Sequence, residues 1–204
     1  MAKPQRLVVG ITGASMPQLG IRLLQVLRDS PVETHLIVSK GARRTIAIEA
    51  TGWTVASVQD LADVVHAPED LAAPVSSGSF LTLGMVVVPC SMNAASRIAY
   101  SIADDLISRA ADVTLKESRP LVLVPRESPL HLGHLRNLTR ASEIGARILP
   151  PVLGSYYAPQ TIDDVIDHLV GRVLDQFSID NELVNRWQGA PRRVTEATAD
   201  QDVR

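Results

Sequence analysis

The sequence predicts a single-domain α/β fold in which helices cover both faces of a parallel sheet. Short runs of β-branched and aliphatic residues alternate along the chain with segments of helical periodicity, which is typical of right-handed βαβ units. The 204 residues are 46% hydrophobic, enough for one sizeable core. Only 3% are aromatic, so Val, Leu, Ile and Ala must build most of that core, as in sheets covered on both faces.

Five segments have the composition of buried strands. The clearest is GMVVVP, a continuous apolar run that is followed at once by small polar residues. The segment around Asp63 is the weakest, because it is short. The expected strands are Arg6–Thr12, Glu33–Ser39, Asp63–His66, Gly84–Pro89 and Pro120–Val124.

Six segments have helical periodicity. In the first, Leu19, Leu23 and Leu27 recur on one face. In the last, Thr161 can cap the helix and two aspartates suit its positive N-terminal end. Residues 72–80 and 150–159 are rich in Pro, Ser and Gly and are expected to be loops. The expected helices are Pro17–Arg28, Lys40–Ala50, Ser91–Tyr100, Asp104–Glu117, His131–Ala146 and Thr161–Phe177.

Charge and composition argue against several classes of function. The net charge of −2 gives no electrostatic reason to expect nucleic acid or an anionic membrane as a partner. The single cysteine, Cys90, rules out an internal disulfide, and the N-terminal apolar run is too short for a membrane span or a signal peptide. A cytoplasmic protein is therefore expected. The five histidines form no metal-ligand pattern, so no metal is expected.

Small and polar residues follow the expected strands, where a parallel sheet binds its ligands. Gly13, Ala14 and Ser15 follow the first strand. They could form an anion-binding site, or they could form only a tight turn between strand and helix. Ser39 follows the second strand and could contact a ligand, although capping of the next helix is the more common role. The same two interpretations apply to the segment after the Gly84–Pro89 strand, which contains Ser91, Met92, Asn93 and Ala94.

Several charged residues could bind an anionic ligand. Arg109 and Lys116 share a helical face with Asp112, which is more often a solvated salt-bridge stripe than a site. Arg126 and Glu127 follow the Pro120–Val124 strand and so face the expected crevice.

Arg172 falls on the apolar stripe of the last helix. Its spacing from Val165 and Leu169 predicts burial, and a buried arginine needs an anionic partner. A phosphate ligand and a carboxylate across a subunit interface are equally compatible with this spacing.

In their order and spacing, nine short segments resemble the UbiX-like flavin prenyltransferases, including the small B subunits encoded with phenolic-acid decarboxylases. The resemblance runs from about Arg6 to about Gly189. The segments are GITGAS from Gly10, ETHL with Ser39-Lys40, SSGSF from Ser76, PCSM from Pro89, RAADV with LKE from Arg109, LVLVPRE from Leu121, Pro150-Pro151 with Tyr156, RVLDQF from Arg172, and RWQG from Arg186.

The resemblance implies a Rossmann-like (flavodoxin-like) fold, with a flavin-binding domain over residues 1–189. Residues 190–204 are polar and lack periodicity, so a disordered tail is expected there. It implies metal-free transfer of a dimethylallyl group from dimethylallyl phosphate to reduced FMN, with bonds formed at flavin N5 and C6. The product, prenylated FMN, would serve a UbiD-like decarboxylase. A homo-oligomer is also implied, namely a dodecamer in which the Tyr156 loop and the last helix complete the site of a neighbouring subunit.

By matching position, the resemblance also assigns roles to single residues. Ser15 and Glu49 would relay protons near N5, and Lys116 and Glu127 would act with them in catalysis. The residues that would contact FMN are Gly13, Ala14, Ser15, Ser39, Ser91, Met92, Asn93, Ala94 and Arg126. Those that would hold the allyl phosphate are Arg109, Lys116, Glu127, Tyr156 and Arg172.

Three positions depart from the family pattern. Met16 replaces a usual glycine and would add bulk beside the flavin loop. Asn93-Ala94 replaces Lys-Thr, which could remove a hydroxyl contact to the flavin. Ser118 replaces an arginine after Lys116-Glu117. Two alternatives follow: a related flavin-dependent cysteine decarboxylase, faintly suggested by Asn93 after Met92, and an FMN-binding homologue that does not prenylate.

Overall fold

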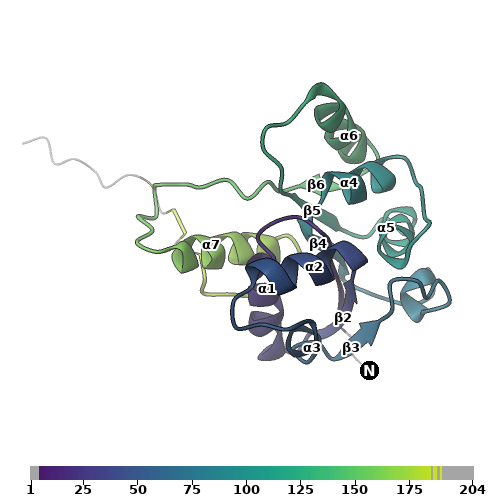
Figure 1. Cartoon of the computed structure of the whole chain (residues 1–204), viewed down its shortest axis with the longest axis horizontal. Coiled ribbons are helices and arrows are strands. Elements are labelled where there is room, and N and C mark those ends of the chain that lie inside the picture. Colours follow the sequence, from purple (N-terminus) through teal and green to yellow (C-terminus); the bar gives the residue numbers. More distant parts are fainter. Residues whose placement is uncertain (1–4, 185, 188, 190–204) are drawn as a thin grey trace, which may run out of the picture.

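Six parallel strands form one sheet in the order β3-β2-β1-β4-β5-β6 (Figure 1). The computed structural model describes residues 5–184, 186, 187 and 189. The strand order reverses between β1 and β4, as in doubly wound Rossmann sheets, so the predicted fold class is confirmed. The strands are β1 (Arg6–Ile11), β2 (Glu33–Val38), β3 (Val64–His66), β4 (Gly84–Cys90), β5 (Leu121–Pro125) and β6 (Arg147–Ile148).

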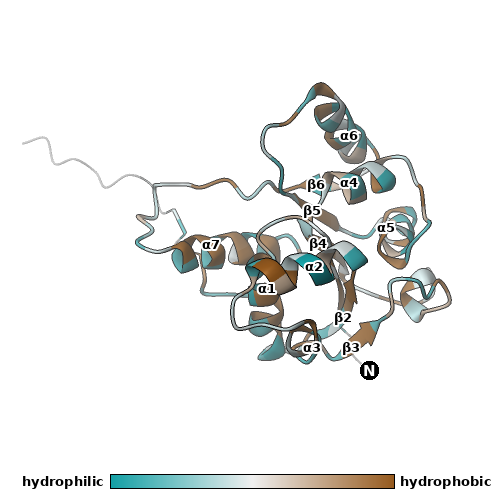
Figure 2. Ribbon diagram, viewed as in Figure 1, coloured by the Kyte–Doolittle hydropathy of each residue, from teal (hydrophilic) through white to brown (hydrophobic). Residues whose placement is uncertain are grey.

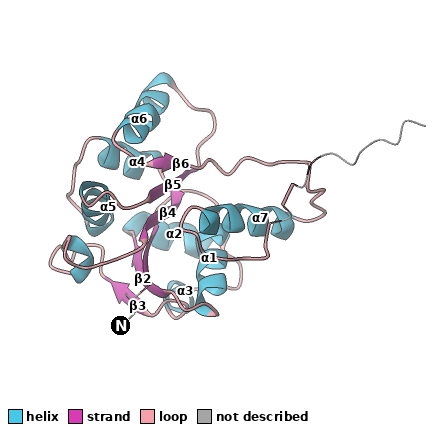
Figure 3. Ribbon diagram, turned by 180° about the vertical axis from the view of Figure 1, so that it is seen from behind, coloured by secondary structure: helices cyan, strands magenta, loops and turns pink. Residues whose placement is uncertain are grey.

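Helices cover both faces of the sheet (Figures 1 and 3). One face packs against α1, α2, α3 and α7, and the other against α4, α5 and α6. The helices are α1 (Gln18–Arg28), α2 (Lys40–Glu49), α3 (Val55–Gln59), α4 (Met92–Ala99), α5 (Leu106–Lys116), α6 (Leu132–Glu143) and α7 (Ile162–Asp175), with a 3₁₀ turn, η1, at Pro74–Ser76.

Because both faces are covered, neighbouring strand residues enter different cores. In β1, Leu7 and Val9 pack with α1 and α7, whereas Val8 packs with α5. All seven residues of β4 are buried, which explains its continuous apolar sequence. In Figure 2 the strands are mainly brown, whereas α7 alternates between brown and teal along its ribbon.

Three short elements were not predicted from the sequence. The helix α3 has five residues and begins with a reciprocal capping box between Thr54 and Ser57. The turn η1 lies in the predicted loop over residues 72–80, and β6 has only two residues. The helix α6 ends at Glu143, so the prediction that it continues to Ala146 was wrong. The three elements α3, η1 and β6 carry too few residues for a periodic signal.

The other predicted elements are confirmed to within two residues. Thr161 caps α7 with a reciprocal capping box to Asp164, and residues 150–159 contain no helix or strand. The expected tail over residues 190–204 lies outside the described residues. Among the described residues, no helix combines the length and the apolar character that a membrane crossing requires.

Arg172 corrects one prediction. Its side chain is 48% exposed and pairs with Asp175 on its own helix, with Nη1 and Oδ2 3.1 Å apart. The buried stripe of α7 is centred on Ile166, Val170 and Val173. Val165, from which the burial of Arg172 was inferred, is itself only partly buried. Seven-residue spacing places Arg172 beside Val165, at the margin of the stripe and not in the core.

Candidate functional site

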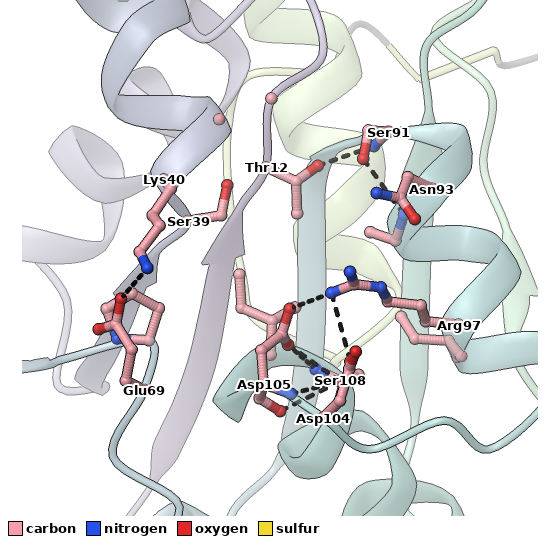
Figure 4. Close-up of a pocket in the computed structure, with 16 residues that line it drawn as sticks. Thr12, Ser39, Lys40, Glu69, Ser91, Asn93, Arg97, Asp104, Asp105 and Ser108 are labelled. Carbon is pink, nitrogen blue, oxygen red and sulfur yellow. Dashed lines mark hydrogen bonds and ion pairs between the residues drawn. The ribbon is translucent and has the colours of Figure 1, made fainter.

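A cavity of about 610 Å³ lies at the carboxyl ends of β1, β2 and β4 (Figure 4). The strand order reverses there, so the loops after β1 and β4 diverge to opposite faces and leave a crevice. The volume is within the range of cofactor and substrate sites. The lining residues are Thr12, Gly13, Ser39, Lys40, Gly41, Pro68, Glu69, Ser91, Asn93, Ala94, Arg97, Ile98, Asp104, Asp105, Ile107 and Ser108.

Two glycines bring the loops after β1 and β2 into direct backbone contact. A Cβ atom placed on Gly13 would lie 2.9 Å from Cα of Gly41, and one on Gly41 would lie 3.1 Å from Cα of Gly13. Any larger residue would therefore push the loops apart. The close approach leaves backbone, with little side-chain bulk, at this wall of the cavity.

Thr12 ties the loop after β1 to the loop after β4. Its side chain is buried, and its hydroxyl donates to the carbonyl of Pro89 at 2.8 Å and accepts from the amide of Ser91 at 2.7 Å. A single hydroxyl thus satisfies two backbone groups at the point where the sheet splits. This bond pair fixes where α4 begins relative to β1.

Two helices begin at the cavity. The hydroxyl of Ser39 accepts from the amide of Ala42 at the start of α2, and that of Ser91 accepts from the amide of Ala94 at the start of α4. Both serines are therefore helix caps, one of the two roles that the sequence left open. The first amides of each helix have no intrahelical acceptor and carry the positive end of the helix dipole. The cavity wall is thus suited to an anion.

Charged side chains line the two sides of the cavity in Figure 4. On one side, Lys40 pairs with Glu69 at 3.2 Å, and this contact lowers the pKa of the Glu69 carboxyl. On the other side, Arg97 pairs with Asp104 at 3.3 Å and Asp105 at 2.9 Å. Sequence reasoning missed these residues. Lys40 follows Ser39 directly, which is a usable signal, but nothing local places Arg97 near the start of α5.

Ser15 and Glu49 are in direct contact. The Ser15 hydroxyl lies 2.7 Å from Oε2 of Glu49, and the amide of Met16 donates to the same oxygen at 3.0 Å. The side-chain amide of Gln18 donates to the Glu49 carbonyl at 2.9 Å, so both ends of this residue are held. The structure thus brings together the two residues predicted to relay protons.

Met16 has a φ of 71°, a left-handed conformation that favours glycine. Its side chain is partly buried and packs against the hydrophobic core that includes α1 and α7. The extra bulk relative to glycine is therefore accommodated against the core. The unusual backbone angle aims the Met16 amide at Glu49.

The predicted FMN-contacting residues gather around this crevice. Ala14 and Met92 are buried next to lining residues. Arg126 donates its backbone amide to the carbonyl of Cys90 at 3.1 Å, and its side chain is exposed beside Glu127 at the end of β5. The predicted residues that line the cavity itself are Gly13, Ser39, Ser91, Asn93 and Ala94.

The predicted phosphate-binding residues do not line the cavity. The helix α5 begins there, and as the crossover between the parallel strands β4 and β5 it runs back toward the opposite edge of the sheet. Its eleven residues carry Lys116 roughly 16 Å from its start. Arg109 pairs with Asp112 at 3.2 Å, as in the salt-bridge interpretation of this stripe, whereas Lys116 pairs with its neighbour Glu117 at 2.6 Å. Tyr156 and Arg172 lie on the segment before α7 and on α7.

Cys90 is confirmed as a buried hydrophobic residue. Its side chain is fully enclosed at the end of β4, and burial raises the pKa of the thiol to about 12. The thiolate, which is the nucleophilic form, is therefore negligible at neutral pH. Within the described residues, no group of three His, Cys, Asp or Glu side chains is arranged to hold a metal ion.

Comparisons with known proteins agree with the resemblance. The flavoprotein family model matches residues 1–174. The flavin prenyltransferase UbiX of Escherichia coli K12 is 58% identical over 189 residues, which cover 91% of this chain and all of the relative. A probable UbiX-like flavin prenyltransferase of Streptomyces sp. D7 is 53% identical and covers 90% of this chain and 92% of the relative.

Solved structures place the fold in the same group. A dodecameric FMN-dependent UbiX-like decarboxylase from Escherichia coli O157:H7 is 50% identical, with a TM-score of 0.88 over 91% of this chain and 100% of the other. AnUbiX in complex with FMN and dimethylallyl pyrophosphate is also 50% identical, with a TM-score of 0.90 over 93% and 100%. The family match, the identity and the shared fold together show that the chain belongs to the flavoprotein family and, within it, to the UbiX-like flavin prenyltransferases.

Proposed function

We propose that this chain transfers a dimethylallyl group from dimethylallyl phosphate to reduced FMN and that the prenylated FMN serves a UbiD-like decarboxylase. We place this reaction in the cytoplasm. The observation that carries the proposal is the Ser15–Glu49 contact directly after the glycine loop of the cavity. AnUbiX, which shares half of its residues with this chain, was solved with FMN and dimethylallyl pyrophosphate.

The residues present fit FMN. The Gly13–Gly41 contact leaves a wall of backbone, and the starts of α2 and α4 present free amides to the same space. These features suit a phosphate ester, and Ser39, Ser91 and Asn93 add polar groups. Reduced FMN supplies the electron-rich ring that accepts the allyl group. The residues that would hold it are Gly13, Ala14, Ser15, Ser39, Ser91, Met92, Asn93, Ala94 and Arg126.

Ser15 and Glu49 can hold and move a proton. The Ser15 hydroxyl donates to Glu49, which leaves the oxygen of Ser15 free to accept a proton from a bound ring. Glu49 ends α2, where the helix dipole disfavours a carboxylate, and the Ser15 hydroxyl and Met16 amide offset that cost. The pair is therefore placed to take up a proton at Ser15 Oγ and pass it to Glu49.

The allyl phosphate would be held by Arg109, Lys116, Glu127, Tyr156 and Arg172. Fixed cations that stabilise the leaving phosphate lower the barrier to breaking the allylic C–O bond, without a metal. None of these residues lines the cavity of a single chain. We therefore propose a homo-oligomer, a dodecamer like the E. coli O157:H7 relative, in which neighbouring subunits complete the site. Light scattering that returned a 22.0 kDa monomer at micromolar concentration would contradict this.

The rival function is cysteine decarboxylation. The FMN-dependent cysteine decarboxylase SpaF shares 20% identity with this chain, with a TM-score of 0.58, so this likeness shows the fold alone. The half-identical relatives favour prenylation. Retained FMN binding without turnover would instead indicate the homologue that does not prenylate.

The decisive experiment is anaerobic incubation of the protein with reduced FMN and dimethylallyl phosphate, followed by mass measurement of the released flavin. The expected result is a gain in mass of one C5H8 unit. Controls omit the protein or the dimethylallyl phosphate. An unmodified flavin from folded, FMN-bound protein would contradict the proposed function.

A further inference from the structure

Four aromatic side chains lie together around the helix α7, and we name them the Tyr156 cluster. Tyr156 and Tyr157 belong to the segment before α7, His168 to α7 itself, and Trp187 to the segment after it. The ring of Tyr157 stacks on His168, with centroids 3.9 Å apart and planes inclined by 8°. Tyr156 meets His168 edge-on, with its hydroxyl 3.1 Å from Nε2. Trp187 meets Tyr156 edge-on, with centroids 6.2 Å apart.

The imidazole of His168 is 7% exposed, and its other nitrogen, Nδ1, has no hydrogen-bond partner in the part of the chain that the structure describes. Among the described residues, the imidazole of His168 therefore makes its hydrogen bond with the Tyr156 hydroxyl. A buried polar group that loses its partner is costly, so this bond holds Tyr156 in one orientation. Segment 150–159 contains no helix or strand that could do so.

Much of the Tyr156 side chain remains accessible. Tyr156 is 55% exposed and, with Trp187, lines an open hollow of about 300 Å³. Arg172 lies one helical turn after His168, close enough for its charge to act on the imidazole. The phenol is therefore held by His168 on an accessible surface, and the helix that carries His168 also carries a cation, which is an arrangement suited to a phosphate group.

We propose that His168 is a positioning residue for the allyl phosphate: its Nε2–H donates to the Tyr156 oxygen, which leaves the phenolic O–H free to donate to a phosphate oxygen. This inference rests on the proposed function, because Tyr156 is the residue through which His168 acts. Burial and the nearby charge of Arg172 lower the pKa of His168, which keeps the imidazole neutral at neutral pH. Substrate arrival then requires no change in the protonation of the pair.

Four variants test this: His168→Phe, His168→Gln, Tyr156→Phe and the double variant His168→Phe/Tyr156→Phe. Phe keeps the stack on Tyr157 but removes the donor. We expect His168→Phe to raise the KM for dimethylallyl phosphate about 3- to 10-fold, the range for one neutral hydrogen bond, with kcat nearly unchanged. His168→Gln, whose amide can also donate, should restore most of the affinity. The double variant should be no weaker than Tyr156→Phe, because His168 acts through the phenol.

Calorimetric titration of dimethylallyl phosphate into protein loaded with oxidised FMN gives a second readout that needs no turnover. Additive losses in the double variant would overturn the proposal. An unchanged KM together with a lower melting temperature or a smaller assembly in His168→Phe would overturn it as well. If the wild-type protein forms no prenylated FMN, the proposed function fails, and the titration still reports whether His168 and Tyr156 act together on the phosphate.

Discussion

The hydroxyl of Ser15 lies 2.7 Å from a carboxylate oxygen of Glu49, which is 34 residues away in the sequence. Replacing this carboxylate by an amide tests the proposed proton relay. Glu49→Gln keeps an oxygen that can accept from Ser15 and Met16, so FMN binding should be nearly intact. Prenylation should slow by about 100-fold or more, the range for loss of a general acid or base.

Single-turnover formation of prenylated FMN and fluorescence titration of FMN check this expectation. Glu143→Gln, an exposed acid at the end of α6, is the matched control and should retain full turnover. Unchanged turnover in Glu49→Gln would reduce Glu49 to a structural partner of Ser15.

Arg172→Ala should weaken the binding of dimethylallyl phosphate more than the binding of FMN. A guanidinium bound to phosphate contributes roughly 1.5–3 kcal/mol, so the KM for dimethylallyl phosphate should rise about 10- to 100-fold. The fold of the single chain should change little. Asp175, the partner of Arg172, keeps a second arginine, Arg186, at 2.8 Å.

Arg172→Lys is the matched variant and should recover only part of the affinity, because lysine lacks the planar fork. The competing explanation is an ion pair across a subunit interface. In that case light scattering would show that the Arg172→Ala assembly dissociates, while the fraction that stays assembled keeps a normal KM for dimethylallyl phosphate.

Thr12→Val should destabilise the protein and weaken FMN binding. The valine methyl leaves the amide of Ser91 without its buried acceptor, whereas the carbonyl of Pro89 still accepts from the backbone amide of Thr12 at 3.2 Å. An unsatisfied buried group costs about 1–3 kcal/mol, which chemical denaturation can measure. Thr12→Ser retains the hydroxyl and should lose much less stability. Equal losses in the two variants would assign the effect to packing of the methyl group.

Stability should fall as the pH is lowered from about 8 to about 5.5. Burial, with the nearby charge of His35, lowers the pKa of His66 in the folded protein below its ordinary value of 6.5. At pH values well above 6.5 neither state binds this proton. As the pH falls through 6.5, the unfolded chain binds the proton more readily than the folded one, so the free energy of unfolding decreases. His168, whose pKa is also lowered, acts in the same direction.

His66→Gln checks the contribution of His66. The glutamine amide can still donate to Nδ1 of His35, which His66 contacts at 2.9 Å, but it does not titrate. Urea denaturation at several pH values should give a flatter dependence for this variant than for the wild type. Identical slopes would exclude His66 as a cause. The carboxylates near it, Glu33 and Asp63, have pKa values lowered below their ordinary acidic range, so they act only at lower pH.

Local patterns in the sequence were sufficient for most of the architecture. Apolar runs identified β1, β4 and β5 because both faces of the sheet are covered. Thr161 was recognisable as a cap because capping depends on neighbours within four residues. The position of small polar residues after the strands indicated the site, since parallel strands end at a common edge.

The sequence by itself determined the alternation of strands and helices, their caps and the glycine-rich loop of the site, because each depends on residues close together in the chain. Only the tertiary structure decided which distant groups meet. The contacts of Thr12 with Ser91, of Ser15 with Glu49 and of Arg97 with the start of α5 join separate elements. Periodicity indicated which face of α7 carries Arg172, but not where the core stops covering that face. That limit is set by how neighbouring elements pack, which a local pattern does not contain.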